Sequence, residues 1–487
     1  MRLKYLNFAA GLFALACATE PVKGVSAPQD EVTPSEDQDL IPEAADGKFD
    51  TGYLSNLAVE LEGTFESELR IDLTSKSSEE RQAFREQLIS GTMDRFALQT
   101  LIDPQVKFAK NQINAAALHL HLSATDAKVL TAEVEAEGFI RIVYQTTVDT
   151  IVSTEELAKA GLTLEQVRDQ QFAAILPDQP MKMHDKVGLA CQKADQTESS
   201  AYNYFYYFEP DREGCASAMD TAGIRRVGAR LTIKDLAPGK TVYPEYDQLV
   251  ADGKLDIVVF FGAADHDWEP GKWDWGTEGR DVLVRDIQAR NFKRVAEPGL
   301  VGDVFRKRTA TLEETITVIG PEVLKDLTHD DTGLFKNMVT TNEVVIYNGH
   351  SFYGSLDVLN DESIYPPNRY QIFLMSSCWS YEYYTKQIFK HGETEADPNG
   401  WLAADVVNDT EMGWFHNMPH VARILITNLV RGAETGGVEG QRFYTWDRII
   451  GAINTFVVDS QRERATATHE IFGVSGVRNN VYEPSGR

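Results

Sequence analysis

The chain has little that would bind nucleic acid or cross a membrane. Its 487 residues include 47 Lys and Arg against 74 Asp and Glu, which gives a net charge of −27. Phosphate backbones and anionic lipid surfaces repel a protein this acidic, so we exclude nucleic acid as a partner. Beyond residue 17, no apolar run reaches the length of about 18 residues that a membrane-spanning helix needs.

Several enzyme motifs are also missing. The sequence contains no Gly-rich phosphate loop and no zinc signature. A cysteine phosphatase is excluded because its motif would need Arg where Tyr384 stands. His119 and His121 share one face of an expected strand, but zinc needs three or four ligands and no further ligand lies nearby. We therefore predict no metal at this pair.

The first residues predict export. Two basic residues precede an apolar stretch from Phe8 to Ala16, and this pattern is typical of a signal peptide over residues 1–16. The residues up to Cys17 resemble a bacterial lipobox, in which Cys17 becomes the lipid-bearing first residue; ordinary signal-peptidase cleavage is the alternative. We expect an outer-membrane or cell-surface lipoprotein, otherwise a periplasmic or secreted protein. Membrane contact is expected only through the lipid at Cys17.

The segment behind the signal peptide predicts a tether and then a small domain. Residues 17–50 are acidic and interrupted by prolines, and such a segment buries too little apolar surface to fold. Short strands around one helix then predict an α+β domain over residues 51–156. The helix is expected to begin at a capping box formed by Ser77 and Glu80. The expected strands cover residues 57–61, 69–73, 118–122, 129–134 and 139–144.

Residues 157–250 predict a linking subdomain with an aromatic strand. This strand is expected at residues 202–208, and Cys191 and Cys215 lie on either side of it. In an exported protein, two cysteines 24 residues apart are expected to form a disulfide that closes the loop between them. Two buried free thiols are the alternative.

From about residue 251 the pattern changes to alternating strands and helices. This alternation predicts an α/β domain over residues 251–487, with a mostly parallel sheet flanked by helices. Continuous apolar runs such as Asp256–Phe261 are typical of strands that are covered on both faces. A last helix is expected to end before Gly432. The other expected elements are a hairpin at 305–319, strands at 344–347, 372–375 and 404–407, and helices at 281–292 and 419–431.

A His and a Cys follow two of these buried strands. His350 comes after residues 344–347, and Cys378 comes after residues 372–375. Functional side chains of open α/β sheets gather beyond the carboxyl ends of the strands. If the two strands are neighbours, the imidazole can favour the thiolate of a cysteine nucleophile. The alternative is an inert buried cysteine and a structural histidine in a turn.

The two blocks Val344–His350 and Ile372–Cys378 resemble those of the caspase–gingipain superfamily of cysteine peptidases. The gingipain-like branch is the most similar, through its Gly-His and Ser-Cys pairs, and the resemblance covers roughly residues 250–435. It implies a caspase-like fold and a protein or peptide substrate. It further implies that His350 is the general acid and base and that Cys378 is the nucleophile.

The same resemblance implies an oxyanion site made of main-chain amides near Gly349 and Cys378. One position departs from the family, which has Gly directly after the catalytic His where this chain has Ser351. The Cβ of Ser351 would crowd the oxyanion site. The departure therefore leaves open whether the site is active.

The resemblance also implies a specificity pocket for the side chain that precedes the scissile bond. In related peptidases the loop after the first strand and residues near the nucleophile line this pocket. The candidates here are Asp265, Asp267 and Ser376, and an acidic floor would favour Arg or Lys. Some relatives bind calcium, for which residues 397–400 are a candidate, although their types are ordinary turn formers. No other cofactor is expected.

Two further functions compete with the peptidase. One is a catalytically inactive, caspase-like surface lipoprotein that only binds. The other is a serine esterase, because residues 349–354 nearly match the nucleophile elbow, with Ser351 at its centre. The elbow is imperfect, since bulky Tyr353 stands where the strained turn needs a small residue. The acid and base partners of Ser351 would come from Asp405, Asp409, His416 and His420.

Overall fold

A computed structural model describes most of the chain. The described residues are 53–114, 121–159, 161–167, 171–193, 204–236, 242–265, 267–296, 299, 301–324, 333–352, 356–367, 369–397, 399–464 and 470–484. The predicted signal peptide, the tether with Cys17, and His119 lie outside these ranges. Within them, no helix combines the length and the apolar character needed to cross a membrane.

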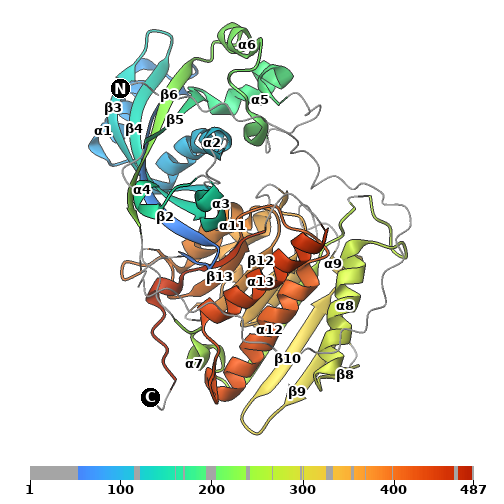
Figure 1. The fold of residues 1–487 in the computed structure, drawn as a ribbon. Helices are drawn as coiled ribbons and strands as arrows, with labels where there is room; N and C mark the ends of the chain where they lie inside the picture. Colours follow the sequence, from blue (N-terminus) through green and yellow to red (C-terminus); the bar gives the residue numbers. More distant parts are fainter. Residues whose placement is uncertain are drawn as a thin grey trace.

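The C-terminal half contains a nine-stranded sheet (Figure 1). Its order is β1-β16-β13-β12-β11-β7-β10-β9-β8, and the five strands from β13 to β10 run parallel. This confirms the predicted α/β class with a mostly parallel central sheet. The strands are β1 (Tyr53–Leu54), β7 (Lys254–Phe261), β8 (Lys293–Val295), β9 (Asp303–Arg308), β10 (Glu313–Ile319), β11 (Val344–Asn348), β12 (Gln371–Ser376), β13 (Ala404–Asp409) and β16 (Phe472–Ser475).

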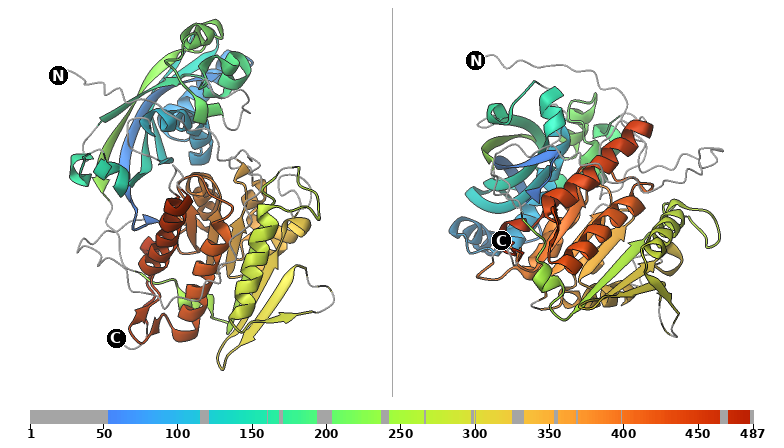
Figure 2. Two further views of the ribbon diagram at one scale, coloured as in Figure 1. Left: turned by 45° about the vertical axis from the view of Figure 1, so that its right-hand side comes forward. Right: turned by 60° about the horizontal axis from the view of Figure 1, so that its bottom comes forward.

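Helices cover both faces of this sheet (Figure 2). One face packs against α8 (Trp275–Ala289), α12 (Met418–Thr435) and α13 (Trp446–Arg464). The other face packs against α9 (Pro321–Leu324), α10 (Gly333–Thr341) and α11 (Ser380–Phe389). The core strands are buried on both sides, which explains their continuous apolar sequences. Smaller elements are α7 (Tyr246–Leu249), η5 (Asp357–Asn360), η6 (Glu362–Ile364), η7 (Lys390–Gly392), β14 (Val438–Glu439), β15 (Arg442–Phe443) and η8 (Val477–Asn479).

Two helices extend beyond their predicted bounds. Helix α8 begins at Trp275 because the preceding Asp274 forms a capping box with Thr277. Helix α12 runs through Gly432 and ends only at Gly436, which adopts the left-handed conformation. The prediction that Gly432 stops the helix is wrong. A Cβ at Gly432 would lie 2.1 Å from the Tyr246 hydroxyl, so this glycine serves close packing instead.

The N-terminal half forms a second, five-stranded antiparallel sheet of order β3-β4-β2-β6-β5. Its strands are β2 (Ala58–Asp72), β3 (His121–Val134), β4 (Phe139–Ser153), β5 (Gln171–Pro177) and β6 (Arg226–Leu236). Two helices, α1 (Ser78–Ser90) and α2 (Arg95–Asn114), pack on it. The capping box of Ser77 and Glu80 is confirmed.

This sheet differs from the prediction in three ways. The strands expected at 57–61 and 69–73 are one long strand, β2, because Gly63 and its neighbours continue the alternation of buried and exposed residues. Helix α2 was not predicted, since Pro104 lies inside it. The sheet also continues past residue 156, because β5 and β6 pair with each other and β6 pairs with β2.

Between β4 and β6 the chain forms short helices rather than a further sheet. These are α3 (Thr154–Lys159), α4 (Leu164–Val167), η1 (Pro180–Lys182), α5 (Met183–Val187), η2 (Gly188–Cys191), η3 (Tyr204–Tyr207) and α6 (Cys215–Thr221). Of the segment 202–208 predicted as a strand, residues 204–207 form the 3-10 helix η3, and residues 202 and 203 lie outside the described ranges. Its ring-bearing residues Tyr204 and Phe205 pack on Phe108 of α2, which favours a compact turn over an extended strand.

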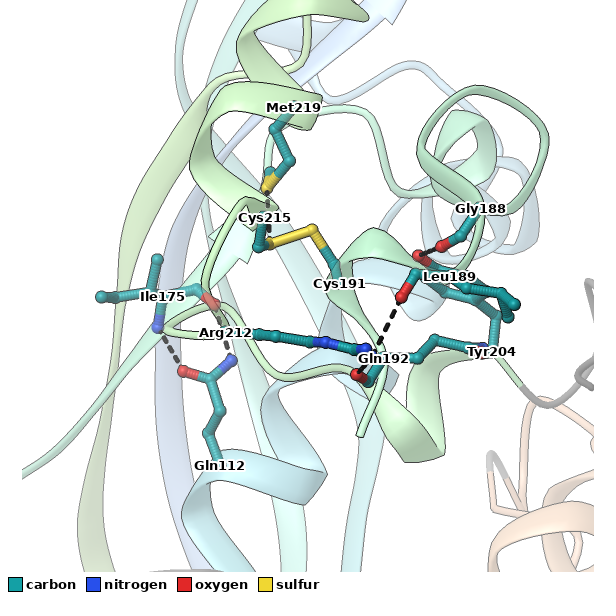
Figure 3. The surroundings of a disulfide bond; sticks show 10 residues. All are labelled: Gln112, Ile175, Gly188, Leu189, Cys191, Gln192, Tyr204, Arg212, Cys215 and Met219. Carbon is teal, nitrogen blue, oxygen red and sulfur yellow. Dashed lines mark hydrogen bonds between the residues drawn. A yellow bond between two sulfur atoms is a disulfide. The ribbon is translucent and has the colours of Figure 1, made fainter. Parts of the chain in front are cut away.

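The predicted disulfide between Cys191 and Cys215 is confirmed (Figure 3). It joins η2 to α6, and both sulfur-bearing residues are buried. Arg212 strengthens the same junction, because its guanidinium donates to the carbonyl of Leu189 at 3.1 Å and to that of Gln192. The cross-link closes a loop whose ends are 24 residues apart.

Reduction of this disulfide is expected to destabilise the N-terminal half. For a loop of this length, breaking the cross-link is expected to lower the free energy of unfolding by roughly 3–4 kcal/mol. We therefore expect thermal unfolding followed by circular dichroism to move to a lower temperature in dithiothreitol. Cys191→Ala/Cys215→Ala should unfold at that lower temperature with or without reductant. An unchanged unfolding temperature after complete reduction would contradict the prediction.

The two halves meet along β1, β2 and helix α11. Strand β1 belongs to the large sheet, and the chain then continues directly into β2 of the small one. Glu60 of β2 is buried at this junction. Its carboxylate accepts hydrogen bonds from the Tyr53 amide and the Tyr381 hydroxyl of α11, both at 3.1 Å. Burial, followed by repulsion from Asp149, raises the pKa of Glu60 from 4.5 to about 8.

The raised pKa of Glu60 should make the free energy of unfolding fall as the pH rises. Its folded-state pKa lies above its unfolded value, so its contribution is present below about pH 4.5 and is lost as the pH approaches 8. Glu60→Gln is expected to flatten the decline of the unfolding temperature between pH 5 and pH 8. Glu269→Gln, an exposed site, is the matched control and should keep the wild-type slope. An unaltered slope in Glu60→Gln would contradict this assignment.

Candidate active site

The carboxyl ends of the parallel strands bring the candidate residues to one edge of the large sheet. Strand β10 lies on one side of β7 and β11 on the other, so the strand order reverses between β7 and β11. Ligands of open α/β sheets bind at such a switch point. Strands β11 and β12 are parallel neighbours, with Asn348 in register with Ser376. His350 lies two residues after Asn348, and Cys378 lies two residues after Ser376. The two strands are therefore neighbours, as the dyad requires.

His350 is held by the main chain of the neighbouring loop. Its Nε2 lies 2.9 Å from the carbonyl oxygen of Ala264, which follows β7. A carbonyl can only accept, so Nε2 carries the proton and Nδ1 keeps the lone pair of a base. The ring also packs edge-on against Phe415, with 5.1 Å between ring centroids. These contacts fix both the tautomer and the orientation of the imidazole.

Asp274 fixes the turn at Ala264, whose carbonyl contacts His350. This buried carboxylate accepts hydrogen bonds from the amides of Ala264 at 3.0 Å, Asp265 at 3.0 Å and Gly276 at 2.6 Å. It therefore caps helix α8 and at the same time fixes the turn that presents the Ala264 carbonyl.

Cys378 lies in a sharp turn between β12 and α11. It is 6% exposed, and its sulfur lies 3.9 Å from the carbonyl oxygen of Gly413. Among the described residues, it is the cysteine that forms no disulfide. The next residue, Trp379, caps α11 with a positive φ of 49° and donates its amide to the Glu411 carbonyl. A thiolate at this position would lie near the positive end of the helix dipole.

Backbone strain gathers at the two candidate residues. Three non-glycine residues of the described ranges have positive φ, and Phe352 and Trp379 are two of them. They follow His350 and Cys378 by two residues and one residue. Such conformations cost of order 1–3 kcal/mol and cluster at functional sites.

The predicted oxyanion role of Gly349 needs correction. The Gly349 amide donates to the Ser376 carbonyl at 3.2 Å, so it is already used in extending the β11–β12 ladder. Ser351, one residue after His350, is buried, and its carbonyl accepts a hydrogen bond from the Tyr384 hydroxyl. On the nucleophile side, a Cβ at Gly413 would lie 3.4 Å from the Cys378 amide, so glycine here keeps that amide uncrowded.

The predicted specificity residues take different positions. Asp265 and Asp267 are exposed on the loop after β7, and the Asp267 amide donates to the Asp265 carboxylate. Ser376 is buried as the last residue of β12. An acidic surface therefore borders the site, while Ser376 supplies its carbonyl to Gly349.

Among the partners named for a serine hydrolase, Asp405 lies away from Ser351. Asp405 is the second residue of β13, in register with Ile372, at the opposite end of the strands from Ser351. Its carboxylate binds Tyr370, Trp446 and Asn480 in the core. The three other candidates make contacts that hold the fold together. The Asp409 carboxylate accepts hydrogen bonds from the amides of Glu411 and Ile471. His416 packs near Trp275 and Trp414, and His420 packs on Phe456.

Of the two candidate metal positions, only the turn that contains Asp397 has a described side chain. The carboxylate of Asp397 accepts from the Leu402 amide at 2.7 Å and from the Asn479 side chain, so both of its oxygens serve the turn. His121 begins β3, but its side chain is not among those described, and His119 lies outside the described residues.

Sequence reasoning proposed His350 and Cys378 as candidates but missed the groups that position them. Ala264 acts through its main chain, which carries no residue-type signal. Asp274 did leave a signal, since Asp followed three residues later by Thr277 is a helix N-terminal pattern. Gly413 could not be linked to Cys378 without the adjacency of β12 and β13.

Comparison with known proteins adds no assignment. No protein-family model matches the chain, and a search of curated proteins found no match.

Proposed function

We propose that the protein is a cysteine endopeptidase of the caspase–gingipain type, with His350 and Cys378 as its catalytic dyad. The observation that carries the proposal is the Nε2 contact of His350 with the Ala264 carbonyl, beside the turn that presents Cys378. This contact leaves Nδ1 as the base, and the parallel register places the thiol at the end of the adjacent strand. The topological switch point supports the same location.

The reaction divides into two displacements. In the first, Nδ1 of His350 takes the thiol proton, and Sγ of Cys378 forms a bond to the peptide carbonyl carbon. The carbon–nitrogen bond then breaks, and His350 returns the proton to the leaving amine. In the second, His350 deprotonates a water molecule, whose oxygen attacks the thioester carbon. The carbon–sulfur bond breaks, the acid product leaves and the thiolate is restored.

Charge on the carbonyl oxygen would be stabilised by main-chain donors of the two turns. Gly349 is committed to Ser376, so the proposal assigns this role to the amides of Ser351 and Cys378. Because these amides are held by strand ends and strained turns, they need little reorganisation during the reaction. The uncrowded position opposite Gly413 fits this role of the Cys378 amide.

Turnover of a peptide library tests the proposal. The full-length protein, produced with its export signal so that the disulfide forms, is incubated with mixed-sequence peptides, and new termini are identified by mass spectrometry. We expect cleavage that disappears in Cys378→Ala and persists in Ser351→Ala or Ser351→Gly. Cleavage that persists in Cys378→Ala, or is absent from the wild type, contradicts the proposal. The predicted Arg or Lys preference fails if Asp or an apolar residue is cleaved at least as fast.

We also propose that the protein acts outside the cytoplasm, anchored through Cys17. The Cys191–Cys215 disulfide supports an oxidising compartment.

A binding protein without catalysis is the second candidate. It is favoured by the low exposure of Cys378 and by Ser351 at the position where the resembling family has Gly. In that case the thiol would react only after unfolding.

A further inference from the structure

Two tryptophans lie exposed beside the candidate site. Trp273 is 65% exposed and Trp275 is 40% exposed, and their rings meet edge to face with 5.0 Å between centroids. Large aromatic side chains bring much apolar surface into water when they are left on a surface. A cluster of them marks a binding surface more often than a scattered single residue does.

Residues 414–416 connect these tryptophans to the segment that contacts His350. Trp275 lies 6.2 Å from the ring of His416, which lies 5.9 Å from the ring of Trp414. Phe415, between these two residues in sequence, packs on His350. We name this set the aromatic ledge: Trp273, Trp275, Trp414, Phe415 and His416.

The ledge is tied to the same support as the candidate base. Asp274 separates the two tryptophans in sequence, and its carboxylate holds the Ala264 turn that contacts His350. Trp275 is also the first residue of α8, so its backbone is fixed by the helix. One buried carboxylate therefore sets the position of the tryptophans relative to the imidazole.

The charges around the ledge restrict its partner. Asp265, Asp267 and Glu269 are exposed on the loop that leads to Trp273; Lys272 of the same loop pairs with Glu269 at 2.8 Å, which leaves the two aspartates as the excess charge. Burial lowers the pKa of His416 to about 4, so this ring is neutral and the ledge itself carries no charge near pH 7. Acidic side chains are repelled by the loop, whereas uncharged aromatic ones can stack on the rings.

We propose that the aromatic ledge is a subsite that binds a large aromatic or apolar side chain of the peptide substrate. This inference rests on the proposed function, because it treats the bound chain as the peptide that Cys378 attacks. Phe415 packs on His350 and adjoins Trp414 and His416 in sequence, so the ledge lies beside the imidazole, and we infer that its occupant is substrate rather than a separate partner. A pocket contact of this kind separates substrates by about 10- to 100-fold in kcat/KM.

The test uses one internally quenched peptide, chosen from a cleaved library sequence, with Phe, Leu, Ala or Glu at each position in turn. We expect one position at which Phe is preferred over Ala by about 10-fold or more, with Glu the poorest. In Trp273→Ala and Trp275→Ala the Phe-to-Ala ratio should fall at least 5-fold. Leu402→Ala removes an exposed apolar side chain of another loop and should leave the ratio unchanged.

Binding without cleavage separates this inference from the proposed function. Cys378→Ala protein is titrated with the Phe and Ala peptides while tryptophan fluorescence is recorded. We expect tighter binding of the Phe peptide, which is lost when Trp273→Ala is added. If the wild type cleaves peptides but neither tryptophan variant alters the Phe-to-Ala ratio, the ledge proposal is overturned and the peptidase stands. If the Phe peptide binds at the ledge but no peptide is cleaved, the peptidase fails and the binding surface stands.

Discussion

Replacing Cys378 with Ala is expected to abolish the rapid reaction of the native protein with limiting iodoacetamide near neutral pH. The other two described cysteines form a disulfide, so among the described residues only Cys378 carries a thiol that iodoacetamide can alkylate. A 6% exposed thiol that lacks an adjacent base should react slowly, whereas one paired with Nδ1 of His350 should react fast. His350→Ala is therefore expected to slow labelling by about 10²-fold or more.

Intact-mass spectrometry follows the labelling, and peptide mapping separates Cys378 from Cys17 of any unprocessed chain. His391→Ala provides a matched control, because this ring stacks on Tyr365 away from the strand ends and should leave the rate unchanged. Labelling that occurs only after denaturation, or at the same rate in His350→Ala, would contradict the dyad and favour the binding protein.

Asp274→Ala is expected to cause the largest combined loss of stability and activity. Three amides, those of Ala264, Asp265 and Gly276, would lose their acceptor. A lost helix cap costs about 1 kcal/mol, and each buried amide left without a partner costs about 1–3 kcal/mol. The cap at Gly276 and the two other amides together give about 3–7 kcal/mol, or roughly 6–28 °C in the unfolding temperature of the α/β domain.

The same substitution should slow the labelling of Cys378, because the Ala264 carbonyl would no longer fix His350. We expect a fall of at least 10-fold, measured well below the unfolding temperature of the variant. Asp274→Asn keeps one acceptor oxygen and should lie between the wild type and the alanine variant in both measurements. If the Asp274→Ala variant is destabilised but Cys378 is labelled at the wild-type rate, the carboxylate stabilises the fold without positioning His350.

The buried strands of the α/β domain were predictable because their signal is local. The run Ile257–Phe261 is apolar throughout, and this composition is typical of a strand covered on both faces. The small sheet was harder, since the length of β2 depends on pairing with β4 and β6 rather than on its own sequence. The strand prediction for residues 204–207 was wrong because aromatic residues favour strands, whereas these residues form η3 and two of their rings pack on Phe108.

The candidate dyad was predictable for the same local reason. Each residue directly follows a buried strand, and parallel strands end at one edge. The supporting groups were not predictable, because they depend on tertiary contacts: the Ala264 carbonyl reaches His350 across 86 positions of sequence. The use of the Gly349 amide likewise follows from the β11–β12 register, which no residue type encodes.

The most direct test of the central claim is covalent trapping with a peptidyl acyloxymethyl ketone that carries a side chain accepted in the library assay. Such a reagent needs substrate-like binding together with an activated thiol. The account predicts one adduct per chain, located by peptide mapping at Cys378, formed by the native protein and lost in His350→Ala. An adduct at Ser351, or none until the protein is unfolded, would contradict it.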